Sequence, residues 1–232
     1  MAFRFGIAVF PGTWSERDCA YAVSLVGAEA VLLWHGDRDL KGCDGLILPG
    51  GFAHGDYLRA GAIARFSPLM EEVQRFARRG GPVLGICNGF QILCEAGLLP
   101  GALLRNQGLQ FRCQATFLRV ESGRGPFLGG LARSAPLRIP ISHGEGRYFA
   151  DPATLAQLEE EGRVAFRYCS QDGELGPEHN PNGSVADIAG ILNPEGNVLG
   201  MMPHPERACE PLLGSADGLQ LFSALLPALA QR

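Results

Sequence analysis

Short apolar runs alternate with amphipathic stretches in the first part of the chain, up to Gly97. Runs of strand length predict β-strands at residues 4–10, 30–34, 45–48 and 82–86, and the last three of these are expected to be buried. Helical spacing predicts helices at residues 13–25, at 63–79 and directly after residue 86. The first begins with a Thr-x-x-Glu capping box, and the second is stopped by Gly-Gly-Pro. Strands that alternate with helices are typical of an α/β protein with a mostly parallel sheet.

The remainder of the chain is dominated by strand-like segments. Residues 114–141 and 163–191 carry short strand patterns separated by Gly and Pro turns, and a final helix is predicted at residues 216–225. We find no repeat, linker or low-complexity segment in the sequence. Because 232 residues suffice for one sizeable core, we expect a single domain over residues 1–232.

A cysteine stands where the strand at residues 82–86 turns into a helix. The spacing Gly85-x-Cys87-x-Gly89 is typical of a nucleophile elbow, in which the apex side chain stands exposed above the sheet. The flanking glycines are expected to allow the sharp turn. At the start of a helix, the helix dipole favours a thiolate. The alternative is a buried structural cysteine.

A histidine and a carboxylate lie two residues apart near the other end of the chain, at His204 and Glu206. Histidine is suited to take and return a proton near neutral pH, and a carboxylate can orient it. We expect Pro203 and Pro205 to keep this segment extended, so that both side chains point the same way. A solvated surface turn is the alternative. Together with Cys87, the order Cys, His, Glu favours a catalytic triad.

These motifs resemble the class I (triad) glutamine amidotransferases, and so does the strand that ends in Pro-Gly-Gly at residues 49–51. The resemblance implies a three-layer, flavodoxin-like α/β fold with a central, mostly parallel sheet. It also implies that the N–H groups of Gly51 and Asn88 form an oxyanion hole, which stabilises developing negative charge. The residues that the resemblance assigns to glutamine binding are Gly50, Gln91, His143 and Gly144.

Longer blocks, at residues 51–64, 142–148, 179–184 and 197–207, are similar to the glutaminase subunits of phosphoribosylformylglycinamidine synthase. This resemblance implies that glutamine is hydrolysed here and that ammonia passes to a large synthetase subunit. That partner would use ATP and magnesium to convert formylglycinamide ribonucleotide, and a small third subunit is common in such complexes. The chain itself is expected to hold no cofactor and no metal, and it carries no phosphate-binding Gly-x-x-x-x-Gly-Lys-Ser/Thr loop.

Composition argues against several other classes of protein. The net charge is −4 without a basic run, which argues against a nucleic-acid partner. No apolar run could span a bilayer, and the N-terminal segment resembles a strand rather than a signal peptide, so we expect a cytoplasmic protein without a membrane partner. The seven cysteines are scattered without a Cys-x-x-Cys pair, which argues against a disulfide framework or zinc site.

Several alternatives stay open on the sequence alone. The chain could be an independent hydrolase of similar architecture, such as a γ-glutamyl hydrolase or cysteine peptidase, or a non-catalytic module on the same fold. His143 competes with His204 for the role of base. The Gly-punctuated loop at residues 52–62 is either a polar surface loop or a segment that covers substrate or docks a partner.

Overall fold

The computed structural model describes residues 2–131 and 135–230. Residues 1, 132–134 and 231–232, among them both ends of the predicted domain, lie outside the described residues. The described strands form one nine-stranded sheet and a separate two-stranded ribbon. The order in the large sheet is β2-β1-β3-β4-β11-β10-β9-β6-β7.

One half of the sheet is parallel and the other half is antiparallel. The parallel half consists of β2 (Glu29–Trp34), β1 (Arg4–Val9), β3 (Gly45–Leu48), β4 (Val83–Ile86) and β11 (Val198–Met201). The antiparallel half consists of β10 (Ile188–Leu192), β9 (Val164–Cys169), β6 (Arg112–Val120) and β7 (Leu137–His143). The ribbon pairs β5 (Ala102–Leu104) with β8 (Arg147–Phe149).

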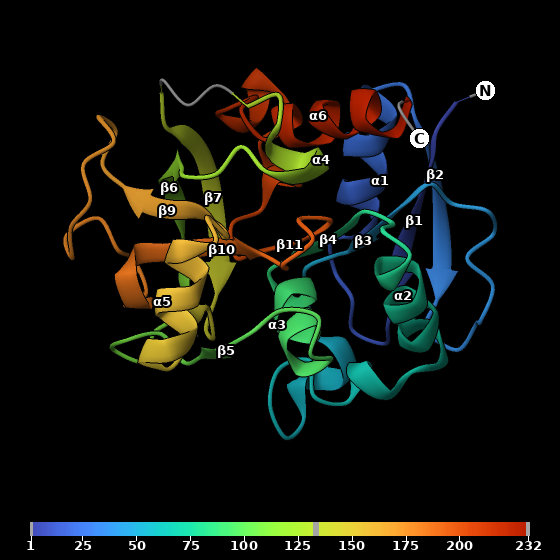
Figure 1. Ribbon diagram of the computed structural model, residues 1–232, viewed down its shortest axis with the longest axis horizontal. Helices are drawn as coiled ribbons and strands as arrows, with labels where there is room; N and C mark the ends of the chain where they lie inside the picture. Colours follow the sequence, from blue (N-terminus) through green and yellow to red (C-terminus); the bar gives the residue numbers. More distant parts are fainter. Residues whose placement is uncertain (1, 132–134, 231–232) are drawn as a thin grey trace.

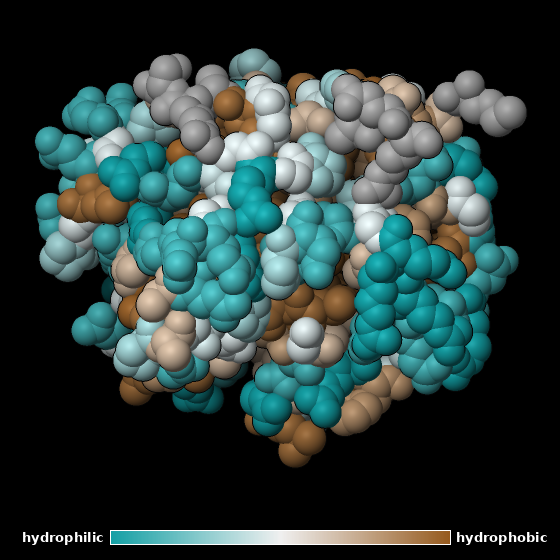
Figure 2. Space-filling view, viewed as in Figure 1, coloured by the Kyte–Doolittle hydropathy of each residue, from teal (hydrophilic) through white to brown (hydrophobic). Residues whose placement is uncertain are grey.

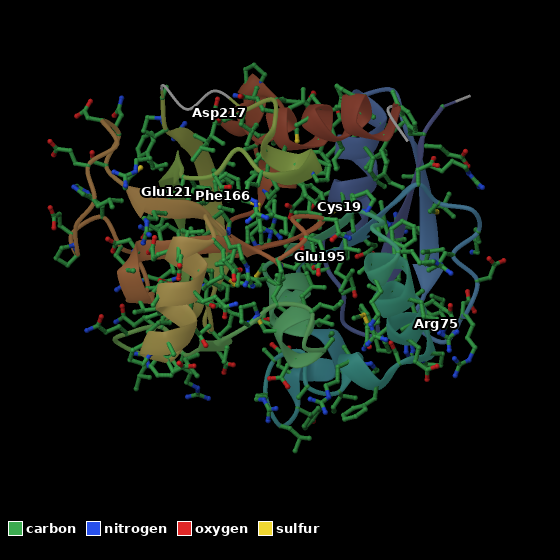
Figure 3. All side chains as sticks on the ribbon, viewed as in Figure 1. Cys19, Arg75, Glu121, Phe166, Glu195 and Asp217 are labelled. Carbon is green, nitrogen blue, oxygen red and sulfur yellow. The ribbon has the colours of Figure 1, made fainter. Side chains whose placement is uncertain are left out.

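Helices cover both faces of the sheet. The described α-helices are α1 (Glu16–Leu25), α2 (Pro68–Arg78), α3 (Asn88–Glu95), α4 (Gly125–Leu128), α5 (Pro152–Glu160) and α6 (Leu219–Ala230). In Figure 1, α1, α4 and α6 gather above the strands, whereas α2, α3 and α5 lie below them. The core extends through both halves, since Cys19 on α1 and Phe166 on β9, both labelled in Figure 3, are fully buried. The predicted three-layer α/β arrangement is therefore confirmed.

Two predictions about the first elements were wrong. The Thr13 hydroxyl does not cap α1 but accepts a hydrogen bond from the Phe10 N–H at 2.8 Å, and the helix begins at Glu16 after Ser15. The second strand is not buried, because β2 lies at one edge of the sheet and pairs only with β1. Leu32 is accordingly 48% exposed. An apolar run alone does not distinguish such an edge strand from a central one.

Two predicted helices have different bounds. The helix expected at residues 63–79 is interrupted, because Ser67 is extended (ψ 150°) before Pro68, where α2 begins. Proline disfavours the helical conformation in the residue that precedes it. The last helix begins later than residue 216 and continues past residue 225 to Ala230, with Pro227 inside it. The helix α5 was not predicted.

The parallel half brings three chain segments together at one edge of the sheet. β4 lies between β3 and β11, with Leu84 opposite both Ile47 and Leu199. The Gly50–Gly51 turn follows β3, Cys87 follows β4, and His204 follows β11. Ligands in open α/β sheets bind at these carboxyl ends. The expectation that all three motifs meet at this edge is confirmed. None of the described helices is long and apolar enough to cross a membrane.

Candidate active site

Cys87 forms the apex of a strained turn between β4 and α3. Its φ of 51° and ψ of −105° are unusual for a residue with a side chain, and such strain is common at functional sites. The flanking glycines serve a different purpose from the predicted one, because neither has a positive φ. A Cβ on Gly89 would lie 1.9 Å from the Leu48 carbonyl oxygen, and one on Gly85 would lie 2.4 Å from Leu93. Glycine is therefore needed for close packing of α3 against the sheet.

His204 and Glu206 form a buried pair. The Nδ1 of His204 lies 2.6 Å from Oε1 of Glu206, and both side chains are at most 2% exposed. Glu206 lies in a short 3₁₀ turn, Pro205–Arg207, so the expected extended conformation was wrong although the two side chains do meet. Because the Glu206 carboxylate accepts the hydrogen bond from Nδ1, the Nε2 of His204 remains available toward the pocket, which Cys87 also lines.

The charge of Glu206 governs the protonation of His204. Burial alone would lower the pKa of His204, but the Glu206 carboxylate and the nearby Cys87 outweigh it and raise that pKa above its usual range. Arg207 adds a cation, since its Nε lies 3.7 Å from Oε1 of Glu206 and its guanidinium donates to the Ser15 hydroxyl at 2.8 Å. Glu206 and Cys87 thus favour a protonated imidazole at His204, whereas Arg207 stabilises the charge of Glu206.

The Gly50–Gly51 turn is fixed by hydrogen bonds to the segment that contains Trp14 and Ser15. The Gly50 carbonyl accepts hydrogen bonds from the N–H groups of Trp14 and Ser15, each at 3.1 Å. Because no described peptide bond is cis, the Gly51 N–H points away from that segment. A Cβ on Gly50 would lie 2.6 Å from Cε1 of His204, so the turn packs directly on the imidazole.

Two buried amide side chains link the segments around the cysteine. Oδ1 of Asn88 accepts from the Ala53 N–H at 3.0 Å, and its Nδ2 donates to Oε1 of Gln91 at 2.9 Å. Nε2 of Gln91 in turn donates to the Glu145 carbonyl at 2.6 Å. The Asn88 N–H lies in the first turn of α3, where helix amides have no partner within the helix. Gln91 is only 6% exposed, so it is not a surface glutamine.

His143 differs from His204 in its surroundings. Its Nδ1 lies 3.1 Å from the amide oxygen of Asn106, and no carboxylate contacts it among the described residues. Burial, together with the neighbouring His204, lowers the pKa of His143 to about 4. A neutral imidazole without an orienting carboxylate is poorly suited to be the base, which favours His204 over His143. Gly144 accepts a hydrogen bond from the Asn106 N–H at 2.9 Å.

These segments enclose a pocket of about 450 Å³, a volume typical of small-molecule sites. Six of the nine predicted site residues line it: Gly51, Cys87, Gln91, His143, Gly144 and His204. Gly50, Asn88 and Glu206 lie behind that lining and contact it as described above. Within residues 2–131 and 135–230, no group of three or more His, Cys, Asp or Glu side chains is arranged to hold a metal ion.

Sequence reasoning missed several residues that line the pocket or support its lining. Asn106 is buried and holds the turn at residues 143–146 through Oδ1, which accepts from the Gly146 N–H at 3.0 Å, and through Nδ2, which donates to the His143 carbonyl at 2.8 Å. Nothing in the sequence around Asn106 distinguishes it from a loop asparagine. Trp14 and Phe111 line the pocket but look like ordinary exposed aromatic residues. Arg207 also lines the pocket, and its position next to Glu206 in the sequence was a usable signal.

Comparison with known proteins identifies the family. Residues 2–219 match the family of CobB/CobQ-like glutamine amidotransferase domains. The chain belongs to this family. Among similar glutamine amidotransferases is the phosphoribosylformylglycinamidine synthase subunit PurQ of Moorella thermoacetica, which is 60% identical over 96% of this chain and 95% of that protein. The PurQ subunit of Thermus thermophilus is 55% identical over 98% of this chain and all of that protein.

A solved structure of this family confirms the predicted fold. The structure of PurLQS from Thermotoga maritima contains a chain that superposes with a TM-score of 0.87 at 40% identity. The match covers 99% of this chain and all of the other. A glutamine amidotransferase from the same organism shares the fold at 16% identity with a TM-score of 0.60. The flavodoxin-like class I glutamine amidotransferase fold expected from the motifs is thus confirmed.

Proposed function

We propose that this chain is the glutaminase subunit of phosphoribosylformylglycinamidine synthase, a complex of purine biosynthesis. One observation carries the proposal: the buried pair of His204 and Glu206 lies at the pocket lined by Cys87, at the apex of its strained turn. The near full-length similarity to PurQ subunits supports the specific assignment. The alternative of a non-catalytic module is disfavoured because the nucleophile, base and orienting carboxylate are all present.

The first half-reaction forms a covalent intermediate. The thiolate of Cys87 attacks the side-chain amide carbon of glutamine, and the carbonyl π electrons move to oxygen. The N–H groups of Gly51 and Asn88 donate to this oxyanion. The imidazolium of His204, stabilised by Glu206, then gives its proton to the departing nitrogen. Ammonia leaves and a glutamyl thioester of Cys87 remains.

The second half-reaction returns the enzyme to its starting state. A water molecule gives a proton to the neutral imidazole of His204 and attacks the thioester carbon. The oxyanion is bound again, the C–S bond breaks, and glutamate leaves while Cys87 regains its thiolate. Gly50, Gln91, His143 and Gly144 hold glutamine in position. Asn106 supports this arrangement by fixing the turn that carries the last two of these residues.

The acceptor chemistry belongs to other subunits. A large synthetase subunit uses ATP and magnesium to convert formylglycinamide ribonucleotide with the ammonia, and a small third subunit completes the complex. The PurLQS complex of Thermotoga maritima, whose name includes two further components, supports this assembly. In this proposal residues 1–232 act as one amidotransferase domain in the cytoplasm.

The test compares the two nitrogen sources in the assembled complex. Cys87→Ser is expected to abolish glutamine-dependent synthesis while ammonia-dependent synthesis continues, because the thiol serves only the release of ammonia. Cys113→Ser, which changes an exposed cysteine outside the pocket, is the matched control. Retained glutamine hydrolysis in Cys87→Ser would overturn the assignment. Steady hydrolysis of peptides by the unsubstituted chain would favour a cysteine peptidase instead.

A further inference from the structure

Asp56 brings a carboxylate into the pocket from the loop that follows the Gly50–Gly51 turn. The residue lines the pocket together with Cys87 and Gln91. Its Oδ1 accepts a hydrogen bond from Nδ2 of Asn88 at 3.3 Å, so it lies beside the residue that follows the nucleophile. The loop beyond it is strongly exposed, with Leu58 at 90%. Figure 2 shows an apolar tip at the lowest point of the molecule, where Figure 1 draws this loop.

The carboxylate of Asp56 has no cationic partner. Among the described residues, no Lys, Arg or His side chain approaches Asp56 within ion-pair distance. The carboxylate next to it in the pocket, Glu145, is different, because it pairs with Arg105 at 3.4 Å. Burial and the charge of Glu145 together raise the pKa of Asp56 to about 6, although the hydrogen bond from Asn88 acts in the opposite direction. The ionised form of a half-buried carboxylate without a cationic partner is stabilised by any cation that enters the pocket.

Glutamine itself supplies such a cation. If the side-chain amide is at Cys87, the α-ammonium group lies only a few bonds away and must be accommodated within the same pocket. We propose that Asp56 binds the α-ammonium group of glutamine and so makes the site selective for an α-amino acid amide. This inference rests on the proposed glutaminase function. It assigns to Asp56 a role in substrate recognition that is separate from the triad and from the oxyanion N–H groups.

The network around Asn88 gives Asp56 its position. The two N–H groups of Asn88 Nδ2 are directed at Gln91 and Asp56, while its oxygen accepts from Ala53. The orientation of this amide is therefore fixed by partners on both sides. As a result, the Asp56 carboxylate retains one oxygen that Asn88 does not occupy, and this oxygen is available to a substrate ammonium.

Asp56→Asn is the appropriate variant for the test. Asp56 has a φ of 54°, and asparagine tolerates this left-handed conformation better than other residues with side chains. The new amide can still accept the hydrogen bond from Asn88 through its oxygen. The substitution therefore removes the charge and leaves the local backbone unstrained. Asp172→Asn, at an exposed position outside the pocket, is the matched control.

The experiment compares glutamine with glutaramate, which is glutamine without its α-amino group. The complete complex is assayed at a pH of about 8, above the pKa of about 6 of Asp56. Asp56→Asn is expected to lower kcat/KM for glutamine about 10- to 100-fold, the range that a lost charged hydrogen bond produces, and to leave kcat/KM for glutaramate unchanged. Competitive inhibition gives a second measure: the inhibition constant of glutamate should rise by a similar factor, while that of glutarate should not.

Other outcomes would overturn the inference. An equal loss with glutamine and glutaramate would mean that Asp56 acts only through the loop or through Asn88. No loss with either substrate, or an unchanged inhibition constant for glutamate, would exclude contact with the α-ammonium group. A larger selective loss in Glu145→Gln than in Asp56→Asn would assign the contact to Glu145. If the unsubstituted complex did not hydrolyse glutamine at all, the proposed function itself would fail and this inference with it.

Discussion

Replacement of Glu206 by glutamine tests the separate roles of the residues in the proposed triad. Glutamine has the shape of glutamate, and its amide oxygen can still accept the Nδ1 proton of His204, so the orientation of the imidazole is retained. The negative charge is lost. Hydrogen bonds to charged groups contribute about 1.5–3 kcal/mol, against about 0.5–1.5 kcal/mol between neutral groups. Burial then opposes protonation of His204, and only the nearby Cys87 still favours it.

The size of the effect follows from the two oxygens of Glu206. Oε1 is bonded to His204, whereas Oε2 is buried without a hydrogen-bond partner among the described residues. In Glu206→Gln the NH2 group takes this second position and is left unsatisfied. We expect a total loss of about 2–3 kcal/mol in transition-state stabilisation, or about 30- to 150-fold in kcat/KM. His204→Ala removes the proton carrier itself and is expected to cost about 10²–10⁴-fold.

The pH dependence has a definite sign. Glu206 raises the pKa of His204, so the imidazolium persists to higher pH in the unsubstituted protein. In Glu206→Gln this pKa falls, and the alkaline limb of the kcat/KM profile is expected to move to lower pH. The assay is glutamine hydrolysis by the complex, with ammonia-dependent synthesis as the measure of intact assembly. Glu174→Gln, at an exposed position, is the control. A loss equal to or larger than that of His204→Ala, or an unmoved alkaline limb, would refute this division of roles.

Three further expectations concern the thiols, one glycine and the isolated chain. A diazo-ketone analogue of glutamine should label Cys87 ahead of the other cysteines, and mass spectrometry that finds equal labelling of Cys169, whose pKa burial raises to about 11, would contradict this. Gly89→Ala should lower the free energy of unfolding by about 1–3 kcal/mol, because its Cβ would lie 1.9 Å from a backbone oxygen, and urea denaturation measures this loss. Gly129→Ala, with its nearest neighbour at 3.5 Å, should have little effect. The isolated chain should have a much lower kcat/KM for glutamine than the complex with its substrates, and a full rate without partners would favour an independent hydrolase.

The parts of the site that the sequence predicted follow local rules. An elbow is encoded by a strand, a reactive residue and a helix start within a few positions, and the Pro-Gly-Gly turn is equally compact. Parallel strands bring their carboxyl ends to one edge, so Cys87, His204 and the glycine turn had to meet if the strands were neighbours. The reason for Gly85 and Gly89 was not predictable in the same way. Gly85 on β4 faces Leu93 on α3, and Gly89 on α3 faces Leu48 on β3, and these contacts form only when the chain folds.

The parts that the sequence did not predict depend on distant partners. Asn106 is important because the turn at residues 143–146 folds over it, and the same residue in another fold would be a solvated loop asparagine. The helix α5 buries only Leu158, which is too little apolar periodicity for prediction, although Asp151 caps it by accepting from two N–H groups at 3.0 Å. The edge position of β2 depends on the order of strands, which a run of apolar residues does not contain.

The hydrogen bonds of the Gly50 carbonyl limit how strongly the glycine turn can control the isolated chain. A flip of the Gly50–Gly51 peptide would break its bonds to Trp14 and Ser15 and would turn the Gly51 N–H away from the oxyanion. Two such bonds contribute about 1–3 kcal/mol. These bonds are present without a partner and disfavour the flipped state about 5- to 150-fold, so a partner that only reverses the flip can change the rate little. A larger ratio between the complex and the isolated chain requires a second contribution, and the exposed loop that carries Asp56 is the segment placed to supply it, because the same loop connects the turn to the substrate pocket.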